Sequence, residues 1–357
     1  MNADACDSTG PELVDGPLGW SPDLAAGSSG GNTRSEMTGH HSNVAKVPAA
    51  TALIRARGLT KRFGSFTAVD GIDFELRRGE AFGFLGPNGA GKSSTMRMIG
   101  CVSPPSEGEL TILGLDPVAD GPAIRARLGV VPQEDTLDVE LTVRENLLIY
   151  GRYFGLPRAV IRERSARLLD FVQLADRQDD KVEPLSGGMK RRLTIARSLI
   201  NEPEILLLDE PTTGLDPQAR HVVWDRLFRL KQQGVTLVLT THYMDEAEQL
   251  CDRLVVMDAG KIAASGSPRE LIDEYSTPEV LELRFDPAEH ETAAEKLAGV
   301  PAQRREVLAD RVLLYVRDGD AALAAVRALG LEPLTSLVRR STMEDVFLRL
   351  TGRRLED

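Results

Sequence analysis

The sequence is poor in cysteine and in long hydrophobic runs, and each shortage excludes a class of protein. Its 357 residues include three cysteines, Cys6, Cys101 and Cys251, with neither a CxxC spacing nor a neighbouring His cluster. They are predicted to be reduced packing residues of a cytoplasmic protein, not a disulfide framework or a metal site. No stretch approaches the ~18 consecutive apolar residues of a membrane-spanning helix, so work at a membrane would require another chain to cross it.

Positive charge is also in deficit, since 43 Lys and Arg face 54 Asp and Glu, a formal net charge of −11. Non-specific affinity for nucleic acid comes from clustered Lys and Arg, so no nucleic-acid partner is expected. What the sequence does contain is 42% hydrophobic residues, enough for a well-formed core, in a chain whose length predicts two domains.

Composition divides the chain into three parts. Residues 1–50 are rich in Gly, Ser, Asp, Ala and Pro without apolar periodicity, which predicts a disordered N-terminal extension. Met37 begins a shorter reading frame, so it stays open whether residues 1–36 belong to the working protein. Residues 51–276 are predicted to form the main domain. Residues 277–357 are predicted to form a small α+β domain with strands 280–285, 312–316 and 334–338 and helices 291–297, 321–329 and 343–350.

Short β-rich runs alternate with helical periodicity in the main domain. This alternation predicts an α/β fold with a mostly parallel sheet covered by helices, together with an antiparallel β region. A long helical stretch between strands predicts an inserted helical subdomain at about 134–200. The expected strands are 53–57, 74–76, 81–85, 110–112, 129–131, 205–208, 236–240 and 254–257, and the other expected helices are 217–233 and 243–251.

The segment Gly-Pro-Asn-Gly-Ala-Gly-Lys-Ser-Ser at 86–94 fits the pattern G-x-x-x-x-G-K-[ST] directly after an apolar strand and before a helical run. Its glycines allow successive backbone N–H groups to converge on anionic oxygens, next to the positive end of the helix. An ordinary tight turn with a solvated lysine is the alternative. The candidate nucleotide-binding residues are Gly86, Asn88, Gly89, Gly91, Lys92 for the β- and γ-phosphates, Ser93 for Mg²⁺, and Ser94.

Two adjacent carboxylates, Asp209 and Glu210, follow the apolar strand 205–208. Ligands of open α/β sheets bind at the carboxyl ends of strands, where the phosphate loop also lies. We therefore expect Asp209 to hold Mg²⁺ with Ser93, and Glu210 to polarise an attacking water. An Asp-Glu-Pro turn with solvated acids is the alternative.

A second candidate anion site begins at Leu185-Ser186-Gly187-Gly188-Met189, before a helical run. Ser186 is a natural N-cap, and the glycines expose backbone N–H groups at the helix start. Taken alone, this segment is better explained as a plain helix cap.

The motifs occur in a fixed order that includes Val131-Pro132-Gln133, Gly214-Leu215-Asp216-Pro217 and His242. In this combination the chain resembles the ATP-binding cassette (ABC) ATPases, a family of P-loop NTPases, over about residues 53–275. The resemblance implies an ATPase that uses ATP and Mg²⁺.

The resemblance also assigns roles one residue at a time. Phe63 matches the aromatic residue that stacks on adenine, where the family more often has Tyr, although Phe63 is alternatively a core residue. Gln133 matches the residue that contacts Mg²⁺ and the attacking water, and His242 the residue that holds the γ-phosphate. The implied catalytic residues are Glu210, His242, Gln133 and Lys92, and the implied metal ligands are Ser93, Gln133 and Asp209.

Three further residues match positions that act across a dimer. Ser186 and Gly188 match residues that contact the γ-phosphate held by the opposite subunit, and Asp216 lies in a loop that crosses the dimer interface. The resemblance therefore implies a homodimer that encloses two ATP molecules between its subunits.

Segments 141–147, 150–155, 218–221 and 343–353 resemble ATPase subunits of nodulation-factor exporters and, more loosely, of daunorubicin-type exporters. This implies export of an amphiphilic substrate, a lipo-oligosaccharide or a drug-like molecule, through a separate transmembrane permease. The protein would then lie at the cytoplasmic face of the cell membrane, and its C-terminal domain would regulate or help pair the subunits. The alternative is a soluble cassette ATPase of translation or assembly.

A groove for a permease helix is a further expectation, since apolar residues follow Gln133 closely. Packing within the helical subdomain explains some of these residues equally well. The apolar residues are Leu137, Val139, Leu141, Leu147, Leu148 and Tyr150.

Overall fold

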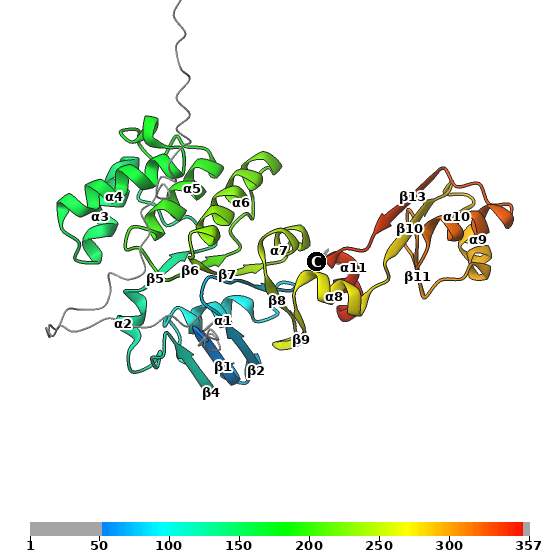
Figure 1. Cartoon of the computed structure of the whole chain (residues 1–357), viewed down its shortest axis with the longest axis horizontal. Coiled ribbons are helices and arrows are strands. Elements are labelled where there is room, and N and C mark those ends of the chain that lie inside the picture. Colours follow the sequence, from blue (N-terminus) through cyan, green and yellow to red (C-terminus); the bar gives the residue numbers. More distant parts are fainter. Residues whose placement is uncertain (1–51, 353–357) are drawn as a thin grey trace, which may run out of the picture.

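A six-stranded sheet forms the centre of the larger part of the chain, which the computed structural model describes over residues 52–352 (Figure 1). The segment predicted to be disordered, 1–50, lies outside the described residues. The strand order is β5-β6-β7-β3-β8-β9, and all neighbours except β8 and β9 run parallel, so the predicted mostly parallel sheet is confirmed. The strands are β3 (Ala81–Leu85), β5 (Leu128–Val131), β6 (Ile205–Asp209), β7 (Thr236–Thr241), β8 (Arg253–Asp258) and β9 (Lys261–Gly266).

The central strands β3, β6, β7 and β8 are buried on both faces, which is why they are largely continuous apolar runs. Successive side chains of a strand point to opposite faces, and in β6 Leu206 and Leu208 join one buried cluster while Ile205 and Leu207 join another. The sheet is therefore the middle layer of three.

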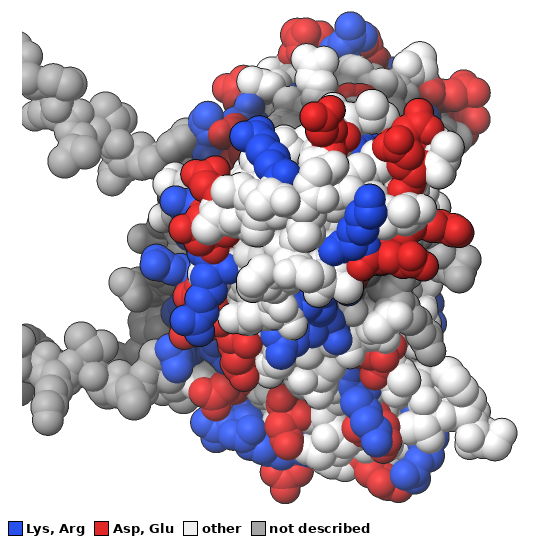
Figure 2. Space-filling model, turned by 90° about the vertical axis from the view of Figure 1, so that its right-hand side faces the viewer, with Lys and Arg blue, Asp and Glu red and all other residues white. Residues whose placement is uncertain are grey.

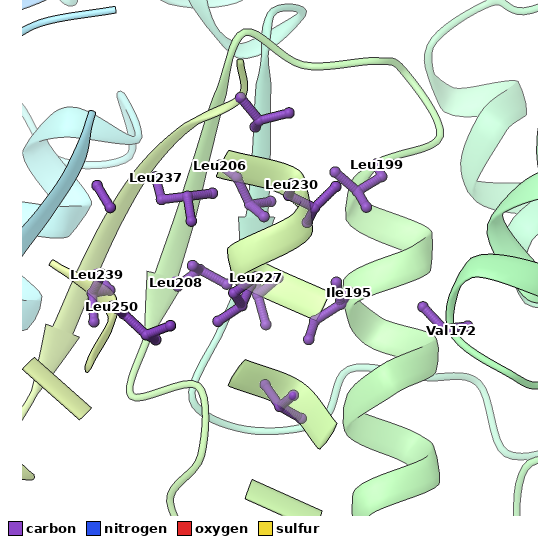
Figure 3. Packing of buried hydrophobic residues seen from close by; sticks show 14 of the residues in the cluster. Val172, Ile195, Leu199, Leu206, Leu208, Leu227, Leu230, Leu237, Leu239 and Leu250 are labelled. Carbon is purple, nitrogen blue, oxygen red and sulfur yellow. The ribbon is translucent and has the colours of Figure 1, made fainter. Parts of the chain in front are cut away.

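Helices form the layer on the Leu206 face. Figure 3 shows α5 and α6 packing their leucines and isoleucines against β6 and β7. The helices of this layer are α3 (Val143–Tyr153), α4 (Arg158–Phe171), α5 (Gly187–Ser198), α6 (Pro217–Gln232) and α7 (Met244–Leu250), with a 3₁₀ turn η2 (Ala175–Arg177). The helical segment between β5 and β6 thus exists as predicted.

The opposite layer contains α1 (Lys92–Ile99), the short α2 (Gly121–Arg125) and an antiparallel sheet in the order β2-β1-β4. Its strands are β1 (Ile54–Phe63), β2 (Phe66–Leu76) and β4 (Glu107–Ile112). β1 and β2 are longer than the predicted 53–57 and 74–76, because exposed residues, several of them charged, interrupt the apolar pattern along both strands. Phe63 pairs with Phe66 across a tight turn in which Gly64 has φ +60°.

The C-terminal unit is built on a separate antiparallel sheet in the order β11-β12-β10-β13, with helices α9 and α10 on one face. β11 was not predicted, because its sequence Arg-Arg-Glu-Val has no apolar alternation. The elements are β10 (Glu279–Arg284), α9 (His290–Lys296), η3 (Leu297–Gly299), β11 (Arg304–Val307), β12 (Val312–Val316), α10 (Gly319–Ala328) and β13 (Thr335–Arg340). Figure 2 looks onto this end of the molecule, where acidic and basic side chains are interleaved.

The last helix, α11 (Met343–Thr351), does not cover the C-terminal sheet but packs against α7 and α8 (Pro268–Tyr275). Its residues Met343, Val346 and Phe347 are buried in the cluster of the main sheet, and the Met343 N–H donates to Glu248 Oε2 of α7 at 3.3 Å. The predicted helix 343–350 exists, but its packing joins it to the larger part of the chain.

A buried carboxylate, Asp345, connects α11 to the C-terminal sheet. Its oxygens accept hydrogen bonds from Arg339 at 2.7 and 3.0 Å and from the Tyr315 hydroxyl at 3.1 Å. Burial alone would raise the pKa of Asp345, but the Arg339 guanidinium and the Thr342 N–H outweigh it and hold the pKa below its ordinary value. Asp345 is therefore charged at neutral pH.

Two further features bear on the expectations above. Among residues 52–352 no helix is both long and apolar enough to span a bilayer.

Cys251 is buried and Cys101 half-buried, and burial raises the pKa of both thiols, so these two are packing residues as predicted. Cys6 lies outside the described residues.

We expect Asp345→Asn to lower the free energy of unfolding by about 2–3 kcal/mol at pH 7, because a buried ion pair is broken while Arg339 keeps partial solvation. A group with a lowered folded pKa stabilises above its ordinary pKa and loses that effect on acidification. The difference from wild type should therefore shrink below about pH 4. Urea denaturation at both pH values measures it.

Asp310→Asn is the matched control, since Asp310 is an exposed aspartate that pairs with Arg311 in the turn between β11 and β12. It should change stability little, and equal destabilisation by both variants would contradict a special role for Asp345.

Candidate active site

The phosphate loop follows β3 and is shaped by three glycines. Gly89 and Gly91 have φ of +79° and +100°, a region that other residues rarely adopt. A Cβ at Gly86 would lie 2.3 Å from the Met257 carbonyl oxygen, so only glycine fits there. No side chain caps the start of α1 at Gly91. The first N–H groups of a helix have no partner within it, so this start is suited to bind an anion.

Lys92 is buried inside this loop. Its ammonium donates to the carbonyls of Gly86 at 2.8 Å and Pro87 at 3.1 Å, and lies 3.8 Å from Glu210 Oε1. Burial lowers the pKa of Lys92, and the nearby carboxylates of Glu210 and Asp209 oppose that shift. The alternative of a solvated lysine in an ordinary turn is therefore wrong.

Asp209 ends β6 beside the first turn of α1. Its Oδ1 accepts from Ser93 Oγ at 3.4 Å and from the Thr240 hydroxyl. Residues 52–352 contain no cluster of three or more His, Cys, Asp or Glu side chains that could hold a metal alone. A hydroxyl and one carboxylate nevertheless suit Mg²⁺, which keeps several waters and binds largely through substrate phosphates. The donor set at Ser93 and Asp209 fits that ion.

Glu210 lies at the centre of the site, only 6% exposed and with φ +45°. Its Oε2 accepts from Gln133 Nε2 at 3.0 Å and Thr213 Oγ1 at 3.1 Å, and its Oε1 lies 3.3 Å from His242 Nδ1. The His242 imidazole holds the pKa of Glu210 below its ordinary value against the opposing effect of burial, with Lys92 and Thr213 adding to it. Glu210 is therefore an anion at neutral pH, able to accept a proton or orient a water.

These side chains meet because of the strand order. β5, β6, β7 and β3 are consecutive parallel neighbours, so the loops after all four lie along one edge of the sheet. The six predicted residues that this edge brings together are Lys92, Ser93, Gln133, Asp209, Glu210 and His242.

A second cluster gathers Ser186, Gly188 and Asp216 at two neighbouring helix starts. Ser186 caps α5 by accepting from the Met189 N–H, and Asp216 caps α6 by accepting from the Ala219 N–H. A Cβ at Gly188 would lie 2.9 Å from the Cβ of Ala219, so the two starts pack closely. In the described part of the chain no hydrogen bond or ion pair joins this cluster to the phosphate loop.

The other three predicted nucleotide-binding residues are wholly or partly exposed. Phe63, at the end of β1, is 49% exposed, with the Lys61 ammonium 5.1 Å from its ring centroid, so the alternative that Phe63 is a core residue is wrong. Asn88 is exposed on the loop and Ser94 is half-buried in the first turn of α1.

Sequence reasoning missed the threonines and the acid that support the site. Thr240 and Thr213 bond the two carboxylates, and the fully buried Glu246 accepts from Thr212 at 2.7 Å and Trp224 at 3.1 Å. Burial raises the pKa of Glu246. The position of Thr240 at the end of a strand beside the acidic strand is the one signal available beforehand.

The expected permease groove is only partly available at the surface. Leu147 is fully buried in the core, so it lines no groove, whereas Val139 is 47% exposed. Leu137, Leu148 and Tyr150 are partly buried against the core of the helical layer. Packing accounts for most of this set.

Comparison with known proteins finds a matching family model in each of two parts of the chain. A family model described as ABC transporter matches residues 69–213, and one described as Nodulation factor export protein NodI, C-terminal domain, matches residues 290–352. Relatives align over most of the chain.

The chain is 47% identical over 312 residues to the Nod factor export ATP-binding protein I of Ralstonia nicotianae, covering 86% of this chain and 96% of that protein. It is also 47% identical over 313 residues to the protein of the same name in Rhizobium meliloti, covering 87% and 92%. No relative named here supports a translation or assembly factor.

A dimeric structure of a post-hydrolysis state of an ATP-binding cassette bound to ADP and Pi is 28% identical, with a TM-score of 0.55. The match covers 60% of this chain and 98% of that one. The predicted P-loop NTPase cassette fold is thereby confirmed.

We expect Lys92→Ala to weaken ATP binding about 10- to 100-fold, because charge-assisted hydrogen bonds to phosphate oxygens are lost. Isothermal titration with ATP and Mg²⁺ measures the affinity. Lys296→Ala, which removes an exposed lysine of α9, is the control and should bind as wild type does. Unchanged affinity in the Lys92 variant would rule out this loop as the phosphate site.

Proposed function

The chain belongs to the ABC transporter family and is the ATP-hydrolysing subunit of an exporter, and from this premise we propose that it works as a homodimer enclosing two ATP molecules. The observation that carries the proposal is the separation of the two candidate clusters. Lys92 begins α1 on one face of the main sheet, and Ser186 caps α5 on the other face. A second copy, placed head to tail, would present its Ser186 end to the ATP held by the first.

The phosphate loop binds the triphosphate in this proposal. Backbone N–H groups of residues 86–94 and the start of α1 surround the phosphates, and Lys92 binds the β- and γ-phosphates from inside the loop. Phe63 stacks on the adenine ring, for which its exposed face is suited. Mg²⁺, bound beside Ser93, Asp209 and Gln133, supplies neutralisation of the phosphate charge.

Hydrolysis falls to the residues around Glu210. The Glu210 carboxylate orients and polarises the attacking water. Gln133 and His242 both contact this carboxylate, so they fix its direction, and both approach the γ-phosphate. Phosphoryl transfer depends mainly on positioning and charge stabilisation, so the site is complete once Ser186, Gly188 and Asp216 of the second copy close over it. Loss of the γ-phosphate removes the anion that both copies share, and the dimer opens.

The division of labour along the chain is part of the proposal. We infer that residues 51–276 form the nucleotide-binding domain, with a helical subdomain at about 134–200, and that 277–357 form an accessory domain whose last helix, α11, packs back on the nucleotide-binding domain. Closure of the dimer on ATP is transmitted to a separate transmembrane permease, and this subunit accordingly lies at the cytoplasmic face of the cell membrane.

The exported substrate is proposed to be an amphiphilic lipo-oligosaccharide, by analogy with the relatives named for Nod factor export. In proteoliposomes that hold the chain with its permease, a lipo-oligosaccharide should stimulate ATP turnover. The same oligosaccharide without its acyl chain is the matched control and should not. Equal stimulation by both compounds, or by neither, would contradict the proposed substrate class.

We expect Glu210→Gln to retain ATP binding and form a lasting dimer, while ATP turnover falls about 10²- to 10⁴-fold, because the water loses its polarising acid. Phosphate release by the assembled transporter and light scattering with ATP measure the two effects. Glu163→Gln, an exposed glutamate of α4, is the control. Near-normal turnover in the Glu210 variant would reject its assignment.

A further inference from the structure

Arg191, in the second turn of α5, is a buried cation whose donors all go to backbone carbonyls. The residue is 5% exposed. Its Nε donates to the Pro211 carbonyl at 2.6 Å, and its Nη2 to those of Asp209 at 3.0 Å and Glu210 at 3.1 Å. Its Nη1 donates to the Pro132 carbonyl and, at 3.5 Å, to that of Gln133. One side chain thus joins α5 to two separate segments of the chain, 132–133 and 209–211.

These acceptors belong to the backbone that carries the reacting side chains. Gln133 lies just after β5, Asp209 ends β6 and Glu210 follows it. The Glu210 backbone has φ +45°, a conformation that costs free energy for any residue other than glycine and persists only where its surroundings hold it. The Arg191 bond to the Glu210 carbonyl is one such restraint.

Burial of this guanidinium is costly, since burial lowers the pKa of Arg191 while the carboxylates of Asp135, Glu246 and Asp209 oppose that shift. A lysine ends in a single compact ammonium that could not reach carbonyls of both segments at once, whereas the planar guanidinium has five donors in a fixed fork. The geometry therefore makes use of a property that only arginine has.

The same helix carries the second cluster. Ser186 caps α5, and Arg191 follows five residues later, about 7.5 Å along the helix axis at 1.5 Å per residue. In the proposed dimer Ser186 contacts the ATP of the second copy, while Glu210 and Gln133 act on the ATP of their own copy. α5 thus lies between the two nucleotides.

We propose that Arg191 is a positioning residue that ties the backbones of Gln133 and Glu210 to α5, so that closure of Ser186 on one ATP sets the hydrolytic residues at the other. The inference deepens the proposed function and rests on it. This coupling makes hydrolysis cooperative in ATP, because the nucleotide bound by one copy contacts α5 of the other, and α5 is tied to the hydrolytic residues of its own copy.

The test compares Arg191→Lys with Arg192→Lys in the full chain assembled with its permease. Arg192 is the matched control, because it is the next residue of α5 and its guanidinium donates to the Val172 and Gln173 carbonyls, away from the site. Steady-state phosphate release over a range of MgATP concentrations gives kcat, KM and the Hill coefficient. Circular dichroism and thermal midpoints establish that each variant is folded.

For Arg191→Lys we expect kcat to fall at least about tenfold, since a small displacement of catalytic groups is costly. KM and ATP affinity should stay within about twofold, since the phosphate loop is intact. The Hill coefficient should fall toward unity. Arg192→Lys should keep all wild-type values. A wild-type kcat and Hill coefficient in Arg191→Lys, or equal losses in both variants, would overturn the proposal.

Two further measurements keep the outcome interpretable. If Arg191→Lys is unfolded, Arg191→Gln replaces it, since glutamine keeps two N–H donors on a shorter, uncharged side chain. Glu210→Gln is assayed in parallel. Turnover by Glu210→Gln would contradict the proposed catalytic site itself, whereas an inactive Glu210→Gln beside a wild-type-like Arg191 variant would contradict only the role of Arg191.

Discussion

Parallel pairing of β5, β6, β7 and β3 is the constraint on which the rest of the molecule depends. It places four loops along one edge of a buried sheet, and each loop contributes one part of the site. The ammonium of Lys92 and the carboxylate of Glu210 are close enough to interact only because their strands are ordered in this way. The two charges lie away from bulk water, where their interaction is stronger than at the surface.

Much of the fold could be predicted because the central strands are buried on both faces. Runs such as Ile205–Leu208 leave few alternatives to a strand, and the glycines and acids at their ends are contiguous in the sequence. β9 and β11 were missed and β1 and β2 were cut short, because half-exposed strands carry polar residues that hide the pattern. Pairing with neighbouring strands determines these elements.

The central residues of the candidate site could be predicted because they lie in short contiguous motifs. The residues that support them could not, because their partners are distant in the sequence. Residues 86–94 and Asp209-Glu210 are local motifs, and their chemistry is visible in the residue types. Arg191 acts through backbone carbonyls, which every residue possesses, so its partners leave no trace in the sequence. Glu246 resembles any acid of an amphipathic helix until the fold places Thr212 and Trp224 beside it.

The return of α11 to pack beside α7 and α8 makes the C-terminal unit an insertion with two tethers instead of a tail with one. The C-terminal sheet is therefore held at both ends, by α8 before it and by α11 after it. Because α11 contacts α7, the sheet is linked to the helix that follows His242. During synthesis on the ribosome, the contacts of α11 with α7 and α8 can form only after the last residues of α11 have been made. A chain truncated just before Met343 would leave apolar surface on α7 and α8 uncovered, however complete its catalytic motifs.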